Sequence, residues 1–136
     1  MTEAGLPAAL TFRSRTMTID ERVCDGVTIL DIRGNLTIDM LRDLVVLDMV
    51  RALIQQGRMN IIINLAEVKQ LDTMGLCNVV EAFITLRRKG GVLKLLGVST
   101  HVREILRVTK LLPLFEIFDS EAAALASFEQ ASNAPS

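Results

Sequence analysis

The run Met59–Leu65 constrains the fold of this chain more than any other feature of its sequence. It reads Met-Asn-Ile-Ile-Ile-Asn-Leu, which is short and nearly continuously apolar. Strands with one face in water alternate polar and apolar residues, whereas strands covered on both faces do not. The run therefore predicts a central strand of a parallel sheet that is covered on both faces.

An antiparallel hairpin is expected before this strand. Two β-rich runs, Met17–Val23 and Val27–Arg33, are joined by Cys24-Asp25-Gly26. Asp-Gly between two such runs favours a tight turn, because the turn requires positive φ angles. The hairpin makes the predicted sheet a mixed one.

Helical and extended segments alternate through the rest of the chain, and this order requires crossovers between parallel strands. We expect the hairpin to break at Gly34-Asn35-Leu36-Thr37, with Thr37 as the N-cap of the first helix. The predicted elements are then a helix to about Gln56, the strand Met59–Leu65, a loop over Ala66–Leu71, a helix over Thr73–Lys89, a strand over Val92–Leu96, a helix over Thr100–Leu111, a strand over Phe115–Phe118, and a helix capped by Ser120 that runs through Glu129. The predicted fold class is α/β, a single domain with a mixed, mainly parallel sheet of four to five strands and four helices.

The chain is long enough for one domain with a sizeable core. Its 136 residues are 50% hydrophobic, which argues against disorder of the whole chain. Residues 1–16 show neither helical nor strand periodicity and are predicted to be a flexible N-terminal extension. Residues 17–130 form the predicted domain, and residues 131–136 are predicted to be a flexible tail.

The composition argues against several classes of function. The net charge is −1 and Trp and Tyr are absent, so we expect no nucleic-acid partner. One His and two Cys are too few for a zinc site, so no metal is expected. No stretch approaches the roughly 20 uninterrupted apolar residues of a membrane helix, so we expect no direct membrane insertion. Cys24 and Cys77 lack a paired spacing and are interpreted as reduced cysteines of a cytoplasmic protein.

No motif for catalysis or cofactor binding is present in the sequence. The glycine patterns of dinucleotide-binding sites, phosphate loops and serine hydrolases are all missing. The single imidazole, His101, fits an exposed neighbour of a helix cap better than a general base. Arg103, Arg107 and Lys110 recur at helical spacing, as on a solvated face. We therefore expect no enzyme activity, no catalytic residue and no cofactor.

The junction between the central strand and the next helix, residues 71–76, is the most informative place for function. It lies near the carboxyl ends of the strands, where sites in α/β sheets form. One interpretation is structural, with Asp72 or Thr73 capping the helix and Gly75 allowing close packing. The other is functional, because a hydroxyl at a helix N-terminus is suited to carrying a phosphate, whose charge free N–H groups and the helix dipole stabilise.

Several segments carry a resemblance to a known family. They are the hairpin end Gly34-Asn35-Leu36-Thr37, the strand residues Ile61–Leu65, the junction Asp72-Thr73-Met74-Gly75-Leu76, the run Gly90-Gly91-Val92-Leu93-Lys94-Leu95 and the run Leu111-Leu112-Pro113-Leu114-Phe115. Together they resemble the STAS domain, the fold of bacterial anti-sigma-factor antagonists and of the cytoplasmic tails of sulphate transporters. The resemblance covers about Met17–Phe128, in one order and with compatible spacing.

The resemblance implies a regulatory function, that of an anti-sigma-factor antagonist. In such antagonists a partner anti-sigma factor with serine/threonine kinase activity phosphorylates the hydroxyl residue after the Asp of an Asp-Ser-x-Gly segment, a position that falls on Thr73 here. The unphosphorylated antagonist binds the anti-sigma factor and frees the sigma factor, and the phosphorylated form releases its partner. ATP and magnesium belong to the kinase. The implied partner-binding residues are Asp72, Met74, Gly75, Leu76, Asn35, Leu36 and Thr37.

The chain departs from the family pattern in two segments. Gly34-Asn35-Leu36-Thr37 replaces a Gly-Glu-Leu-Asp-like turn and so lacks its acidic groups. Met74 stands where a second Ser or Thr is common, and Cys77 stands where a Gly is common. Thr73 is therefore the one candidate phosphoacceptor of its segment.

The first two predicted helices carry more apolar residues than one sheet-facing stripe requires. The surplus lies between Met40 and Ile54 in the first helix and between Val79 and Leu86 in the second. Either the helices pack on each other in a fuller core, or they present an apolar patch to a partner or a second copy. A homodimer is therefore one of the predicted assemblies.

Two other functions are compatible with the same sequence features. STAS-like accessory subunits of lipid ABC transporters carry a similar Asp-Thr-x-Gly segment, so Thr73 does not distinguish them from antagonists. A structural subunit of a larger signalling assembly is the other alternative.

Overall fold

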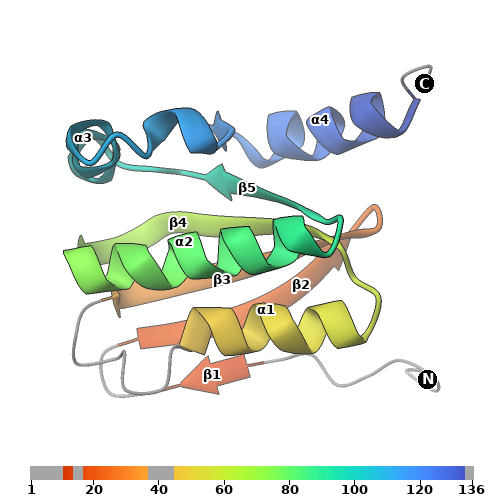
Figure 1. Ribbon diagram of the computed structural model, residues 1–136, viewed down its shortest axis with the longest axis horizontal. Coiled ribbons are helices and arrows are strands. Elements are labelled where there is room, and N and C mark those ends of the chain that lie inside the picture. Colours follow the sequence, from red (N-terminus) through yellow and green to blue (C-terminus); the bar gives the residue numbers. More distant parts are fainter. Residues whose placement is uncertain (1–10, 14–16, 37–44, 134–136) are drawn as a thin grey trace.

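The computed structural model of the chain describes residues 11–13, 17–36 and 45–133, the last four of these by their backbone alone (Figure 1). The expected N-cap Thr37 and the first turns of its helix lie outside the described residues. In chain order the elements are β1 (Thr11–Arg13), β2 (Met17–Cys24), β3 (Val27–Leu36), α1 (Val45–Gln55), β4 (Asn60–Leu71), α2 (Thr73–Arg88), β5 (Val92–Leu96), α3 (Thr100–Val108), a 3-10 turn (Leu112–Leu114), β6 (Ile117–Phe118) and α4 (Glu121–Asn133).

Within the described residues, six strands form one sheet in which each strand lies beside its neighbours in the chain. The pairs β1–β2 and β2–β3 are antiparallel. The pairs β3–β4, β4–β5 and β5–β6 are parallel and are connected through α1, α2 and α3. The predicted α/β class with a mixed, mainly parallel sheet and four helices is confirmed, and the sheet has at least one strand more than predicted.

β4 is the central strand predicted from the run Met59–Leu65, and it lies between β3 and β5. Ile61 and Ile63 belong to the main core beneath α1 and α2, whereas Ile62 belongs to a smaller core beneath α4. All three are 0% exposed. Successive side chains of a strand point to opposite faces, so an unbroken apolar run fits a sheet that is covered on both sides.

The predicted hairpin is confirmed. Cys24 pairs with Val27, and the two residues between them turn the chain. Asp25 has φ 52° and Gly26 has φ 79°, the positive angles that a two-residue hairpin turn requires. The Asp-Gly signal in the sequence therefore identified the turn, and β2 runs one residue further than predicted, to Cys24.

The helices cover the two faces of the sheet unequally. α1 and α2 lie side by side across one face, as Figure 1 shows. Buried residues of α1, α2 and α3 share the main core. α4 contributes Ala124 and Phe128 to the smaller core on the other face. The large apolar side chains of α1 are mostly buried, which favours the interpretation of a fuller core for this helix; the buried ones are Val45, Val46, Leu47, Met49, Val50 and Leu53.

The predicted loop over Ala66–Leu71 is wrong, because these residues form the second half of β4. They pair with the end of β3, which runs to Leu36 and does not break at Gly34 as expected. The register shifts twice, and each shift adds one residue to β4 relative to β3. The apolar residues of this stretch consequently lie three apart, at Leu65, Val68 and Leu71, a spacing that does not resemble the period of a strand.

Part of the predicted flexible extension 1–16 is also structured. Residues Thr11–Arg13 form β1, which pairs with β2 at the edge of the sheet. Phe12 packs against the main core. Three residues are too few to show a periodicity, so only the pairing with β2 reveals this strand.

Three further boundaries differ from the prediction. α3 ends at Val108 because Lys110 adopts φ 63°, and the N–H of Leu111 then donates to the carbonyl of Leu106 at 2.8 Å. β6 is shortened by the 3-10 turn before it. α4 extends to Asn133, three residues into the predicted tail, and its predicted cap is confirmed, since Ser120 accepts the N–H of Ala123 at 3.1 Å.

Candidate functional site

The N-terminus of α2 lies at the carboxyl end of β4, where the sequence placed the candidate site. Asp72 is the N-cap, and its carboxylate accepts the N–H of Gly75 at 2.8 Å. The carbonyl of Asp72 accepts the N–H of Leu76 at 2.9 Å. Of the two capping residues proposed from the sequence, the structure therefore selects Asp72.

Gly75 lets α2 approach the end of β3 closely. A Cβ atom at this position would lie 2.0 Å from the carbonyl oxygen of Leu36, far inside van der Waals contact. The N–H of Asp72 also lies 3.4 Å from that oxygen. The start of α2 is therefore held against the backbone of β3, and the predicted close packing at Gly75 is confirmed.

Thr73 is the first helical residue of α2, and its side chain is exposed. Because Asp72 is the N-cap, the helix does not need the threonine hydroxyl for capping. Met74, the next residue, is 47% exposed, which is unusual for a large apolar side chain. A hydroxyl group and an apolar side chain thus stand side by side at the protein surface.

The other predicted partner-binding residues divide into two groups. Asn35 and Asp72 are half-buried, and the pairing of β3 with β4 brings them to the same edge of the sheet. Leu36, Gly75 and Leu76 are buried and belong to the packing beneath the site. Thr37 lies outside the described residues.

Asn78 is a polar residue of this region that sequence reasoning missed. It is 1% exposed on the buried side of α2, and its side-chain oxygen accepts the N–H of Leu47 in α1 at 3.1 Å. Its side-chain nitrogen has no hydrogen-bond partner among the described residues. The bond joins α1 to the second turn of α2. The signal for it in the sequence was an amide side chain within an otherwise apolar helical stripe.

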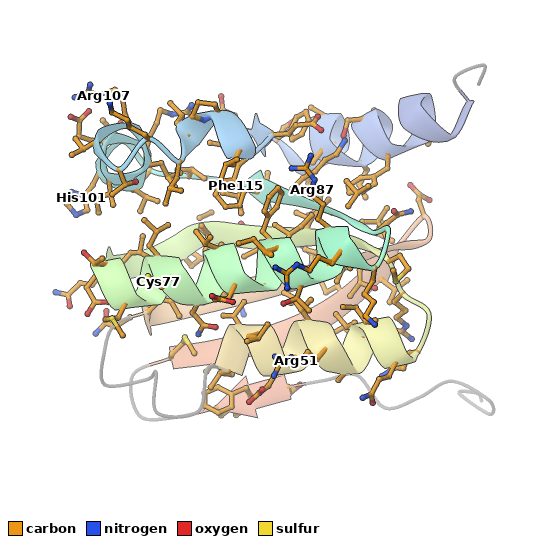
Figure 2. All side chains as sticks on the ribbon, in the orientation of Figure 1. Arg51, Cys77, Arg87, His101, Arg107 and Phe115 are labelled. Atoms are coloured by element: carbon orange, nitrogen blue, oxygen red, sulfur yellow. The ribbon has the colours of Figure 1, made fainter. Side chains whose placement is uncertain are left out.

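A recess of about 430 Å³ lies beside the start of α2. Its walls come from the end of β4 and the start of α3; they are formed by Lys69, Gln70, Leu71, Asp72 and His101. In Figure 2 His101 lies on the side of α3 nearest to α2. The expectation that His101 is exposed beside a helix cap is confirmed, since Ser99 caps α3 by accepting the N–H of Val102 at 3.1 Å.

Two searches of the described residues gave negative results. No group of three or more His, Cys, Asp or Glu side chains is arranged to hold a metal ion. No helix in the described ranges has the length and apolar character needed to cross a membrane.

Comparison with known proteins places this geometry in a family. The sequence profile of the STAS domain matches residues 18–124. No curated protein matches the chain in sequence.

Solved structures share the fold at low sequence identity. An anti-sigma factor antagonist from Mycobacterium paratuberculosis is 20% identical, with a TM-score of 0.70 over 85% of this chain and 97% of that one. The Bacillus cell fate determinant SpoIIAA in its phosphorylated form is 19% identical, with a TM-score of 0.62 over 89% and 99%. A sulfate transporter family protein from Wolinella succinogenes is 21% identical, with a TM-score of 0.65 over 83% and 93%.

Proposed function

The chain belongs to the STAS domain family, and from this membership and the geometry at Thr73 we propose that it is an anti-sigma-factor antagonist switched by phosphorylation. In this proposal it is a protein-binding module without enzyme activity of its own. Its partner is an anti-sigma factor with serine/threonine kinase activity. Both proteins act in the bacterial cytoplasm in this proposal.

The exposed hydroxyl of Thr73 is the observation that carries the proposal. It stands at the first position of α2, next to the N-cap Asp72, where the N–H groups of a helix have no carbonyl partner within the helix. Such N–H groups and the helix dipole stabilise an added phosphate, so the fold tolerates the modification. That one protein of the same fold exists in a phosphorylated form supports the assignment.

The proposed modification is a phosphoryl transfer from ATP bound to the partner. A bond forms between Thr73 Oγ1 and the γ-phosphorus, while the bond from that phosphorus to the β–γ bridging oxygen breaks. ADP leaves, and the hydroxyl proton passes to a base of the kinase. ATP and Mg²⁺ both belong to the partner.

The charge change accounts for the proposed release. Before modification, Thr73 and Met74 offer a small hydroxyl and an apolar contact, which are inexpensive to bury in an interface. A phosphate adds a charge of about −2 beside the carboxylate of Asp72, and this charge must lose water when a partner docks. Binding is therefore favoured before phosphorylation and disfavoured after it.

Substitution of Thr73 tests the proposal, and Thr100 provides a matched control. Thr100 is also exposed, and it is also the first helical residue after an N-cap. Thr73→Glu is expected to weaken binding to the kinase partner by about tenfold or more, whereas Thr100→Glu leaves the affinity unchanged. Thr73→Ala is expected to stay bound when ATP is added.

Mass spectrometry of the kinase reaction supplies the second measurement. Phosphate is expected on Thr73 and on no other residue. Phosphate at Thr100 or elsewhere, or release of the Thr73→Ala protein on ATP addition, would show that the switch assignment is wrong.

A transporter-associated role is the second candidate, since a sulfate transporter family protein has the same fold. Co-purification of the chain with a transporter ATPase subunit, in place of a kinase-like partner, would favour this role. Assembly into a large homo-oligomer would instead favour a structural subunit of a signalling complex.

A further inference from the structure

The recess beside α2 is built from two distant parts of the sequence. The end of β4 and the cap of α2 contribute Lys69, Gln70, Leu71 and Asp72. The first turn of α3 contributes His101. Thr73 follows Asp72 directly, so its Cα lies about 3.8 Å from that of a lining residue. Thr73 is not itself a lining residue, but a phosphate attached to its side chain starts from the position next to the recess.

Besides Lys69 and His101 in the recess, the structure describes twelve basic side chains, of which six are paired with a carboxylate and six are not. The six paired side chains lie within salt-bridge distance of a carboxylate: Arg22, Arg33, Arg58, Lys94, Arg103 and Arg107. In the described part of the chain, Lys69 and His101 take part in none of these salt bridges. The recess thus presents an ammonium group and an imidazole that no carboxylate of the described chain engages.

We propose that this recess receives the phosphate of phosphorylated Thr73, with Lys69 and the imidazole N–H of His101 as its donors. The inference rests on the proposed phosphorylation of Thr73 and adds the site that holds the product. A lysine ammonium group and an imidazole N–H both form strong, charge-assisted hydrogen bonds to phosphate oxygens.

Asp72 explains why such a site needs two donors. Its carboxylate lines the same recess and repels a phosphate on the neighbouring residue. The N–H of Gly75 engages this carboxylate, but its negative charge remains. Lys69 offsets that charge and the imidazole N–H of His101 adds a second donor, so the phosphorylated form holds its phosphate in one position against the protein.

The test uses a chain that carries phosphothreonine at position 73 through genetic incorporation, so no kinase is required. The second ionisation of its phosphate is followed by ³¹P NMR in the native background and in the Lys69→Gln and His101→Gln variants. Lys110→Gln is the control, because Lys110 is an exposed basic residue just beyond the opposite end of α3. Loss of a neighbouring ammonium group or imidazole N–H makes the phosphate dianion less favourable.

The midpoint of the phosphate titration is expected to rise by about half a pH unit in each recess variant and to stay unchanged in Lys110→Gln. Equal midpoints in all four proteins would overturn the proposal. So would a rise in Lys110→Gln as large as those in the recess variants, since it would indicate a general charge effect.

The two proposals fail in different ways. If the kinase partner leaves the native chain unphosphorylated while the incorporated phosphate titrates as expected, the switch assignment is wrong and the recess still binds phosphate. If the kinase modifies Thr73 and the titration is the same in every variant, the switch assignment stands and the recess proposal is wrong.

Discussion

Charged side chains are arranged in opposite ways in two regions of the molecule. Between the hairpin and α4 they form a closed set of hydrogen bonds, here termed the α4 network, which consists of Arg22, Asp31, Asn64 and Glu121. Arg22 donates to Asp31 at 2.5 and 3.1 Å and to Glu121 at 2.8 Å, and Asn64 donates to Asp31 at 2.8 Å. At the start of α2, by contrast, Lys69 and His101 line an open recess.

The charged residues of the α4 network support the fold, whereas we propose that those of the recess bind a ligand. Burial by itself raises the pKa of Asp31, but hydrogen bonds from Arg22 and Asn64 outweigh burial and hold the pKa below its usual value. The hydrogen bonds that Arg22 donates to Asp31 and to Glu121 raise the pKa of its guanidinium group. The α4 network therefore stabilises the folded chain, whereas the recess adds little to stability before a ligand arrives.

Gly75→Ala is expected to have the largest effect, because the backbone at the start of α2 lies directly against the backbone of β3. The new methyl group would lie 2.0 Å from the Leu36 carbonyl oxygen. We expect a loss of about 3 kcal/mol in the free energy of unfolding, measured by denaturant titration. Met74→Ala, one residue away and exposed, should unfold like the native protein; an equal loss in both variants would contradict the packing argument.

Asp31→Ala is expected to cost about 2 kcal/mol, because it removes the acceptor shared by Arg22 and Asn64. The control is Glu104→Ala, which breaks the fully exposed pair with Arg107 and should leave stability unchanged. An equal loss of stability in the two variants would show that the α4 network does not stabilise the fold more than an exposed ion pair does.

Acidification should weaken the α4 network selectively. The pKa of Asp31 is lower in the folded chain than in the unfolded one, so its contribution is present above the unfolded value of about 4 and is lost as pH falls through the folded value. Unfolding midpoints of the native chain and Asp31→Asn, measured from pH 6 to pH 3, should therefore converge below about pH 4. A constant difference across this range would contradict the assignment.

Lys69→Gln and His101→Gln are expected to have the smallest effect on stability. Neither side chain takes part in a salt bridge with the described residues, so the unfolding midpoint should not change. A clear loss of stability in either variant would place that residue in the same class as the α4 network. It would also weaken the case for a recess that is reserved for phosphate.

Signals that act over a few residues were sufficient to predict much of this fold. Four features lie where the sequence predicted them: the Asp25-Gly26 turn, the unbroken apolar run in β4, the strand Val92–Leu96 and the cap Ser120. The junction at Thr73 was identified in the same way, because Asp72 and Thr73 are both residue types that cap the start of a helix.

Features that depend on distant parts of the chain could not be predicted in this way. Lys94 lies in a predicted strand, but nothing nearby in the sequence indicates that it is only 4% exposed. Its ammonium group donates to Ser127 of α4 at 2.7 Å and lies 4.5 Å from the ring centroid of Phe128. The burial of this lysine follows from the position of α4, which no local pattern specifies.

The sequence by itself determined the order of strands and helices after β1, the central strand and the place of Thr73 at the start of a helix, because turns, caps and apolar runs act through neighbouring residues. Only the tertiary structure decided that β3 and β4 continue past Gly34 and Leu65, and that Lys69 and His101 share one recess. The paired residues of β3 and β4, and the two recess residues, are about 30 positions apart in the sequence. The contacts that hold them together form only when the chain folds, so no local pattern specifies them.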